Sequence, residues 1–235
     1  MRIDEPNRLC QEYMSDWKLI TDLIAGEKRI KNAGELYLPK LSGQTESDYK
    51  KYVARGCLFN ALARTLQGMV GAIMRTNAVI EAPDQLQPIL EDATIYQQTI
   101  QEVIRDTVYN VLSYGFFGIL VDMPAATSAS IIAYPYMALY KCTDILNWRT
   151  RVVGDDEQLS AIVLSEVRYK DDIENAYNQI SERIIRVCFI DDDGIYKQRV
   201  FLRSDVGNED IWDSGLRHWS SSRGLQGTGR LFLQR

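Results

Sequence analysis

The first part of the chain carries apolar residues at a helical spacing. They recur about every 3.6 residues and therefore predict one amphipathic helix. Asp4, followed by Glu5 and Pro6, predicts its start, and Gly26 predicts its end. The apolar positions that define this face are Leu9, Tyr13, Trp17, Ile20, Leu23 and Ile24.

A connector of residues 30–40 follows, with the sequence Ile-Lys-Asn-Ala-Gly-Glu-Leu-Tyr-Leu-Pro-Lys. Pro39 forbids a helix through its own position and biases Leu38 towards an extended backbone. The pattern therefore predicts a rigid, extended strut between two amphipathic helices. We expect Tyr37, which lies on this strut, to pack against a neighbouring helix or subunit.

A second amphipathic pattern runs from Thr45 to Ile73 and predicts one long helix. Gly56, Gly68 and Gly71 lie inside it, and each costs up to about 1 kcal/mol relative to alanine. Three such glycines in one helix indicate close packing against another backbone or a kink near Gly68.

A third helix is predicted from about Thr94 to Ser113, and Gly115 ends it. The pattern then changes, because residues 116–121 form a short apolar run ended by Asp122 and Pro124, which is typical of a buried strand. The later extended segments predict hairpins around a single helical turn at Thr143–Asn147. These segments are a piece from Tyr134, then Trp148–Val153, Leu159–Tyr169, Ile184–Ile190 and Ile195–Arg203.

These elements predict an α+β fold in which amphipathic helices precede an antiparallel β meander. Residues 1–115 form the helical region and residues 116–205 the mostly β region. Residues 206–235 have no clear periodicity, and the last 22 of them, from Ser214, include no acidic residue. We expect this irregular tail to be poorly ordered, or to mark a truncated or frame-shifted chain.

Charge and composition exclude several functional classes. The 235 residues carry a net charge of −5, which argues against a general basic surface that coats nucleic acid. Apolar runs stay well short of the roughly 20 residues that a membrane helix needs. The four cysteines are widely separated, so buried free thiols are expected rather than a disulfide framework.

Candidate catalytic chemistry is sparse. The single histidine, His218, lies in the irregular tail, a poor place to hold the geometry of a Ser-His-Asp or Cys-His arrangement. Asp191, Asp192 and Asp193 could hold a hard cation, but a solvated hairpin tip explains them better. Asp122 resembles the carboxylate that ends the strand of a nucleotide hydrolase, yet a phosphate-binding glycine loop does not precede it.

Arg55, Arg64 and Arg75 lie along the second predicted helix and could meet phosphate. A solvated helix face, or ion pairs between subunits, explains these arginines as well and is the favoured interpretation.

Taken together, residues 10–205 resemble the N-terminal half of the portal proteins of tailed double-stranded-DNA bacteriophages. The order and spacing of several short pieces carry the resemblance, since each piece alone is unspecific. The residues that match the family's structural motifs are Trp17, Gly34, Tyr37, Leu38, Pro39, Tyr49, Arg55, Asn60, Gly115, Asp122, Pro124, Asn147 and Trp148.

The resemblance implies a structural subunit of the wing of a ring, usually of 12 copies, at one capsid vertex. It implies no catalytic set and no cofactor. Its partners would be the major capsid protein, the packaging terminase, a tail adaptor and double-stranded DNA that passes without sequence-specific binding. The protein would belong to the virion and, during assembly, to the host cytoplasm, with no membrane involved. Full-length relatives continue into clip, stem and crown elements, so the chain is expected to be a truncated, split or frame-shifted portal, or one piece of the ring.

Two alternatives remain. The chain could be another head-tail connector, such as an adaptor or a minor head protein, which would use the same helices for docking. It could also be a metal-dependent enzyme that uses Asp122 or the aspartate-rich turn.

Overall fold

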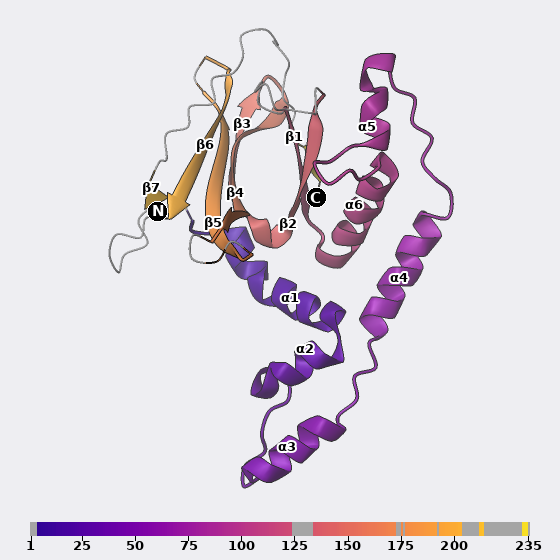
Figure 1. Cartoon of the computed structure of the whole chain (residues 1–235), viewed down its shortest axis with the longest axis vertical. Coiled ribbons are helices and arrows are strands. Elements are labelled where there is room, and N and C mark those ends of the chain that lie inside the picture. Colours follow the sequence, from indigo (N-terminus) through magenta and orange to yellow (C-terminus); the bar gives the residue numbers. More distant parts are fainter. Residues whose placement is uncertain are drawn as a thin grey trace.

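Helices fill the first half of the chain and strands the second, which confirms the predicted α+β class (Figure 1). The computed structural model describes residues 4–123, 134–172, 175, 177–191, 193–203, 212–213 and 232–234. The α-helices are α1 (Arg8–Ala25), α2 (Glu27–Asn32), α3 (Glu46–Arg55), α4 (Ala61–Ile73), α5 (Gln87–Glu91) and α6 (Ile100–Tyr114), and the short 3-10 turns are η1 (Gly34–Leu36), η2 (Asp84–Leu86) and η3 (Cys142–Asp144).

The first helix begins later than the sequence predicts. Asn7 caps α1, because its side-chain oxygen accepts a hydrogen bond from the Cys10 amide at 2.8 Å. The predicted start at Asp4 is therefore wrong. The predicted end is confirmed, since Gly26 adopts a φ of 90° that other residues rarely tolerate.

The connector is not the extended strut that the sequence predicts. Residues 27–32 form α2 and residues 34–36 form η1, so most of the segment is helical. Pro39 restricts only itself and Leu38, which leaves the preceding residues free to turn. Gly26 reverses the chain direction after α1 and lets α2 begin at once.

The prediction of one long second helix is also wrong, because the structure has two helices in this segment. Gly56 leaves the helical conformation with φ −57° and ψ 140°, which ends α3. Asn60 then starts α4 by accepting a hydrogen bond from the Ala63 amide at 3.0 Å. Gly68 lies inside α4, so the predicted kink falls at Gly56 instead.

The third helix starts at Ile100 rather than near Thr94. Thr99 and Glu102 form a reciprocal capping box, and Gly115 ends the helix in a left-handed conformation at φ 71°. Thr94 is buried in the turn that precedes the helix.

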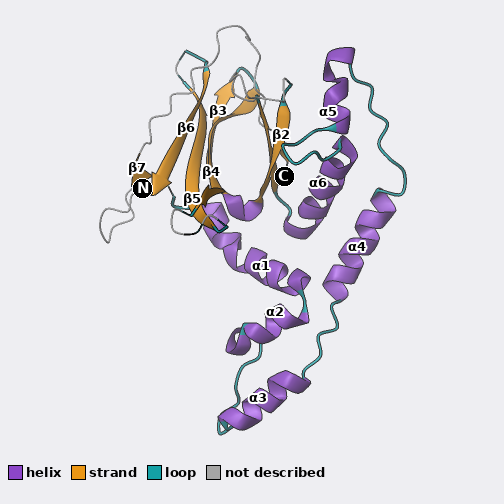
Figure 2. Ribbon diagram, in the orientation of Figure 1, coloured by secondary structure: helices purple, strands orange, loops and turns teal. Residues whose placement is uncertain are grey.

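Two antiparallel sheets follow the helices, with strand orders β2-β1-β8 and β3-β4-β5-β6-β7 (Figure 2). The meander of the second sheet matches the predicted hairpins, and Gly194 at φ 78° turns β5 into β6. Residues 212–213 and 232–234 of the predicted irregular tail form two short strands, and the rest of that tail, with His218, lies outside the described residues. Pro124 and Asp192 also lie outside them. The strands are β1 (Phe117–Asp122), β2 (Tyr136–Lys141), β3 (Ile145–Val153), β4 (Asp156–Asp171), β5 (Gln179–Ile190), β6 (Tyr196–Arg203), β7 (Trp212–Asp213) and β8 (Phe232–Gln234).

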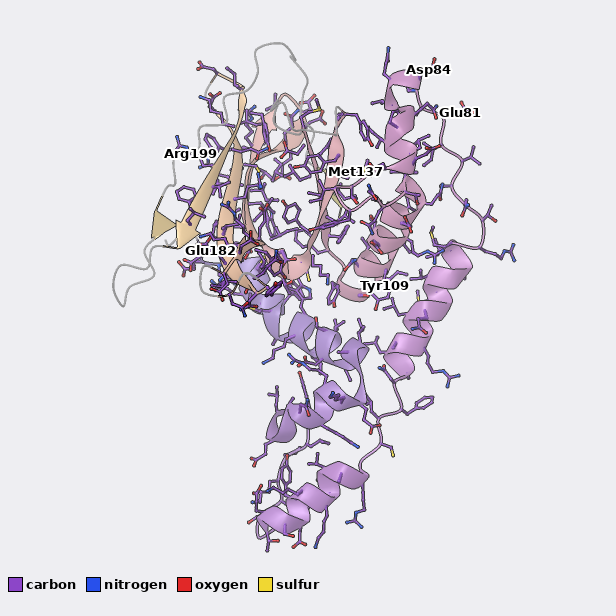
Figure 3. The ribbon with its side chains drawn as sticks, viewed as in Figure 1. Glu81, Asp84, Tyr109, Met137, Glu182 and Arg199 are labelled. Atoms are coloured by element: carbon purple, nitrogen blue, oxygen red, sulfur yellow. The ribbon has the colours of Figure 1, made fainter. Side chains whose placement is uncertain are left out.

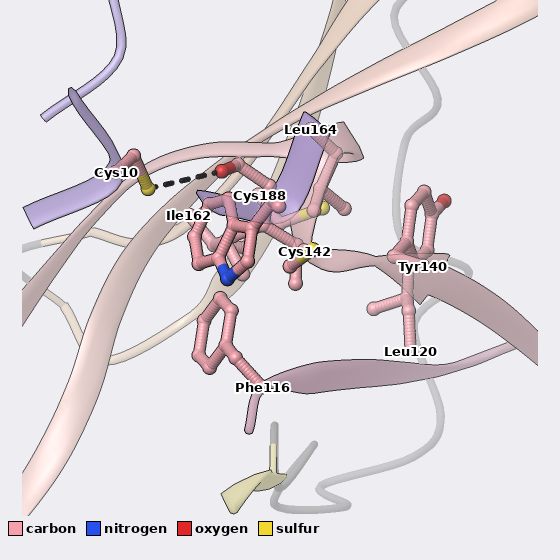
Figure 4. Packing of buried hydrophobic residues seen from close by; sticks show 10 residues of the cluster. Cys10, Phe116, Leu120, Tyr140, Cys142, Ile162, Leu164 and Cys188 are labelled. Carbon is pink, nitrogen blue, oxygen red and sulfur yellow. Dashed lines mark hydrogen bonds between the residues drawn. The ribbon is translucent and has the colours of Figure 1, made fainter. Parts of the chain in front are cut away.

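The main core lies between the two sheets, where side chains of β1 and β2 meet those of β3, β4 and β5 (Figure 4). Close approach is built into it, since a Cβ on Gly118 would lie 2.7 Å from Ile145 Cδ1. Helix α1 closes one end of this core with two of its side chains. The buried cluster is Cys10, Trp17, Phe116, Leu120, Tyr140, Cys142, Ile145, Ile162, Leu164 and Cys188.

The cysteines are free thiols, as the sequence predicts, but one of the four is not buried. Burial raises the pKa of Cys10 to about 11, of Cys142 to about 12 and of Cys188 to about 11. Cys57, between α3 and α4, is exposed.

Trp17 joins α1 to the sheets and generates a stability prediction. Its indole Nε1–H donates to the Tyr114 carbonyl at 3.2 Å, and its ring lies parallel to Phe116. We expect Trp17→Ala to lower the free energy of unfolding by about 3–5 kcal/mol, because a buried aromatic and a hydrogen bond are both lost. Chemical denaturation measures it. Leu19→Ala, at an exposed position of the same helix, is the control, and equal losses in the two variants would refute the assignment.

Candidate functional site

A helical arm, defined here as residues 27–59, extends from the two-sheet body (Figure 1). It contains α2, η1 and α3, and it carries six of the residues singled out from the sequence. These are Gly34, Tyr37, Leu38, Tyr49 and Arg55, together with Pro39 between them.

A buried carboxylate at the end of α1 anchors the arm. Asp22 is only 2% exposed and receives two hydrogen bonds from the arm. Arg29 Nε donates to Asp22 Oδ1 at 2.7 Å, and the Tyr37 hydroxyl donates to Oδ2 at 2.7 Å. The hydrogen bond from Arg29, followed by that from Tyr37, holds the pKa of the Asp22 carboxyl below its ordinary value. Tyr37 thus packs against a neighbouring helix of its own chain.

A second tyrosine fixes the far side of the connector. Tyr49 is buried, and its hydroxyl donates to the Leu38 carbonyl at 2.9 Å. Gly34 favours the turn before the connector, because its backbone φ of 56° lies in the left-handed region that residues with a Cβ rarely adopt. The Tyr49 hydroxyl and an ion pair between Lys40 and Glu46, at 3.1 Å, therefore hold α3 to the connector.

Hydrogen bonds also hold the segment between α3 and α4 to α1 and α2. The Leu58 amide donates to Glu27 Oε2 at 3.0 Å, and Asn60 Nδ2 donates to the Leu23 carbonyl at 2.7 Å. Lys31 contributes an ion pair with Glu27 at 2.7 Å. The hydrogen bond from Lys31, then that from the Leu58 amide, lowers the pKa of Glu27. Asn60 therefore both caps α4 and joins the arm to α1.

The arm presents large apolar side chains to solvent. Leu36 is 60% exposed, Leu41 73% and Phe59 75%, and Tyr52 is 42% exposed. Scattered apolar side chains are normal on a protein surface, but several on one projecting element favour contact with another surface.

The arm offers little for catalysis. An open cleft of about 320 Å³ lies where it meets α1, and the carboxylate that lines the cleft is Asp22. Both oxygens of that carboxylate already accept hydrogen bonds from Arg29 and Tyr37. Asp22 is therefore not available in this cleft as a free acid or base.

A chain of polar side chains crosses the interior between the sheets. Arg186 forms a two-point contact with Glu166, at 2.6 Å and 3.0 Å, and also donates to Gln198 at 2.6 Å. Gln198 donates to Asp122 at 3.0 Å, while the Tyr140 hydroxyl donates to Glu166 at 2.6 Å. Asp122 is therefore one end of a hydrogen-bonded chain that joins the two sheets.

The electrostatics of this interior chain are those of a paired charge. Burial by itself would lower the pKa of Arg186, but the hydrogen bonds and charge of Glu166 outweigh it and raise that pKa. Burial, followed by the charge of Glu166, raises the pKa of Tyr140. Both groups therefore keep their ordinary protonation at neutral pH.

The remaining predicted residues fall in the body. Trp148 is partly buried against the core, with its ring 5.3 Å from that of Phe116, and Asn147 lies at an irregularity in β3. Arg55 belongs to the arm, where it is exposed at the C-terminal end of α3. The predicted residues thus separate into an arm group and a body group.

Sequence reasoning missed the charged partners of both groups. Asp22 and Arg29 are ordinary helix residues in the sequence, seven positions apart and in different helices. Glu166 and Arg186 face each other only because β4 pairs with β5 at Glu166↔Ile184, two residues from Arg186. Such pairs could be found only from the turn at Gly26 and the sheet register.

Within the described residues, groups of three or more His, Cys, Asp or Glu side chains that could hold a metal ion are not found. The helices of the described part of the chain are all too short or too polar to cross a membrane. Comparison with protein-family models and with curated proteins gives no match for this chain.

The anchor at Asp22 predicts a pH dependence. The folded-state pKa lies below the ordinary 3.8, so the stabilisation is complete above about pH 4 and is lost as the pH falls through the folded pKa. We expect Asp22→Asn to be less stable at pH 7 and to lose less further stability between about pH 5 and 2 than the unmodified chain. Urea unfolding across this range measures both.

Asp16→Asn is the matched control, because Asp16 is exposed on the same helix. An Asp22→Asn variant whose pH profile parallels that of the Asp16→Asn variant would contradict the role of this carboxylate.

The interior ion pair predicts a coupling between two strands. We expect Glu166→Leu to lower the free energy of unfolding by about 3 kcal/mol, because it leaves the Arg186 charge largely buried without its partner. The double variant Glu166→Leu, Arg186→Met removes both charges and should recover most of that loss. Lys51→Ala, which breaks an exposed pair with Asp48, should cost no more than about 0.5 kcal/mol. Additive effects in the double variant would show that the pair is not coupled.

Proposed function

We propose that the chain is a structural subunit of a bacteriophage portal ring, in which it forms part of the wing. The observation that carries the proposal is the arm, which combines a fixed backbone with exposed apolar side chains. The resemblance of residues 10–205 to portal proteins supplies the identity of the ring.

The fixed backbone of the arm supports an assembly role. Asp22 and Asn60 hold the arm to α1, and within the arm Glu27 binds the Leu58 amide while Tyr49 holds α3 to the connector. An element that is already ordered loses less conformational entropy when it binds than a free loop does. The exposed side chains of Leu41 and Phe59 would then contribute by leaving water.

The body of the molecule supports the same role. Glu166, Arg186 and Gln198 in its interior are hydrogen bonded to one another, and Asp122 is hydrogen bonded by Gln198. This favours a rigid wing over an enzyme that needs a free carboxylate at Asp122. The partners proposed for the ring are the major capsid protein, the packaging terminase, a tail adaptor and double-stranded DNA.

The proposal predicts rings with a fixed number of copies, close to 12 in related machines. Negative-stain microscopy and native mass measurement of the purified chain, and of virions, test it. We expect Leu41→Ser combined with Phe59→Ser to weaken ring formation by about tenfold or more, because each large apolar side chain contributes about 1.5–3 kcal/mol when buried.

Val152→Ser is the control, because Val152 is 75% exposed on the β3–β4 hairpin and lies outside the arm. A monodisperse monomer at high concentration would overturn the proposal. Density for the chain below the capsid vertex, rather than within it, would assign the chain to an adaptor instead.

A further inference from the structure

Charge is divided unevenly between two parts of the helical region. The arm, residues 27–59, contains seven basic and four acidic residues, a net charge of +3 in a protein whose total is −5. The acidic end, defined here as residues 79–96, contains four acidic residues and no basic residue, a net charge of −4. These two segments have opposite charges of similar size.

The charges that distinguish the two parts are exposed and free of internal ion pairs. In the arm, Lys50 and Arg55 are exposed on α3 and pair with no carboxylate of the described residues. In the acidic end, Glu81, Asp84 and Glu91 are exposed and likewise form no ion pair there. Figure 3 shows Glu81 and Asp84 at the tip beside α5. Both sets are therefore available to a binding partner.

Both parts also expose apolar side chains. In the arm these are Leu36, Leu41 and Phe59, described above. In the acidic end, Val79 is 91% exposed and Tyr96 is 80% exposed, and Leu86 is 42% exposed. Each part therefore combines a net charge, positive in the arm and negative in the acidic end, with apolar area, as the two sides of a protein interface do.

The arm and the acidic end of one molecule lie at opposite ends of its longest axis (Figure 1). They are held there by the packing of α4 against α6 and α1 between them. A contact between two such parts must therefore join different copies of the chain. It is a contact between unlike surfaces, which closes into a ring when the rotation between copies permits.

We infer that the arm of one copy docks on the acidic end of the next copy. Lys50 and Arg55 of the arm face Glu81, Asp84 and Glu91 of the neighbour, and the apolar side chains of both parts are buried between them. The inference rests on the ring assembly proposed above, because it names the contact that would join neighbouring subunits.

A second copy fits the arm better than nucleic acid does. The arm exposes Leu36, Leu41 and Phe59 beside its cations, and a phosphate backbone offers no apolar surface on which to bury them. These leucines have no counterpart on duplex DNA. The acidic end supplies both the missing negative charge and the apolar area, on the same chain and therefore at equal concentration.

Reciprocal charge reversal tests the contact. The arm variant is Lys50→Glu with Arg55→Glu, and the end variant is Glu81→Lys with Glu91→Lys. Sedimentation equilibrium measures self-association at low and high salt. We expect each variant alone to weaken association by about tenfold or more, because like charges then face each other. The combination should restore affinity to within about threefold of the unmodified chain, since attraction returns with its direction reversed.

A matched control reverses Arg151→Glu and Asp155→Lys, both exposed on the β3–β4 hairpin, and should leave association unchanged. Circular dichroism establishes that every variant is folded. Added salt should weaken the association of the unmodified chain, since the Debye length shrinks to about 3 Å at 1 M.

The outcomes separate this contact from the proposed function. Rings that persist with both single-sided variants overturn the contact and leave the ring. Open filaments with reciprocal charge dependence support the contact and overturn the portal ring. A monomeric unmodified chain overturns both. Loss of association that the combined variant does not restore, with binding of duplex DNA that the arm variant abolishes, overturns the contact in favour of nucleic acid.

Discussion

The position of the arm depends on one buried carboxylate. Asp22 lies at the end of α1, and its two oxygens are bound by residues from α2 and from the connector after η1. Gly26 makes the turn sterically possible, but it does not by itself set the direction of the helix that follows. The Asp22 carboxylate sets this direction, because a charge this deeply buried is tolerated only when hydrogen-bond donors reach both of its oxygens. The direction in which α2 and the connector leave α1 follows from these two hydrogen bonds.

The body is held by a different arrangement of the same chemistry. There Glu166 and Arg186 form an ion pair within the larger sheet. Gln198 links this pair to Asp122, and the Tyr140 hydroxyl binds Glu166 directly, so that both hydrogen bonds reach the smaller sheet. Apolar packing brings the two sheets together, and this polar chain restricts how they can be offset, since each donor has one acceptor. The molecule therefore has a body whose register is specified from within and an arm whose direction is specified at its base.

Much of the fold can be predicted from the sequence, because hydrophobic period and turn chemistry are local signals. The strand after Gly115, the hairpins from Trp148 onward and the end of α1 at Gly26 all come from such signals. The errors come from contacts between distant residues. A continuous apolar period hides the break at Gly56, which the tie between Asn60 and Leu23 stabilises. Pro39 suggested an extended strut, but the helical turns before it are held by Arg29 and Tyr37 on Asp22. The structure places Tyr37 and Tyr49, which the sequence singles out, in the arm, whereas their surroundings at Asp22 and Glu27 could not be predicted, because no local pattern marks those carboxylates.

The uneven burial of the thiols has a practical consequence. Cys10, Cys142 and Cys188 are enclosed by the core, where burial keeps them protonated and out of reach. Cys57 is an exposed free thiol between α3 and α4, two residues before Phe59. The unmodified chain therefore carries a natural attachment point for a fluorescent label on its arm. The fluorescence of such a label would report changes in the surroundings of the arm during assembly, without introducing any new cysteine.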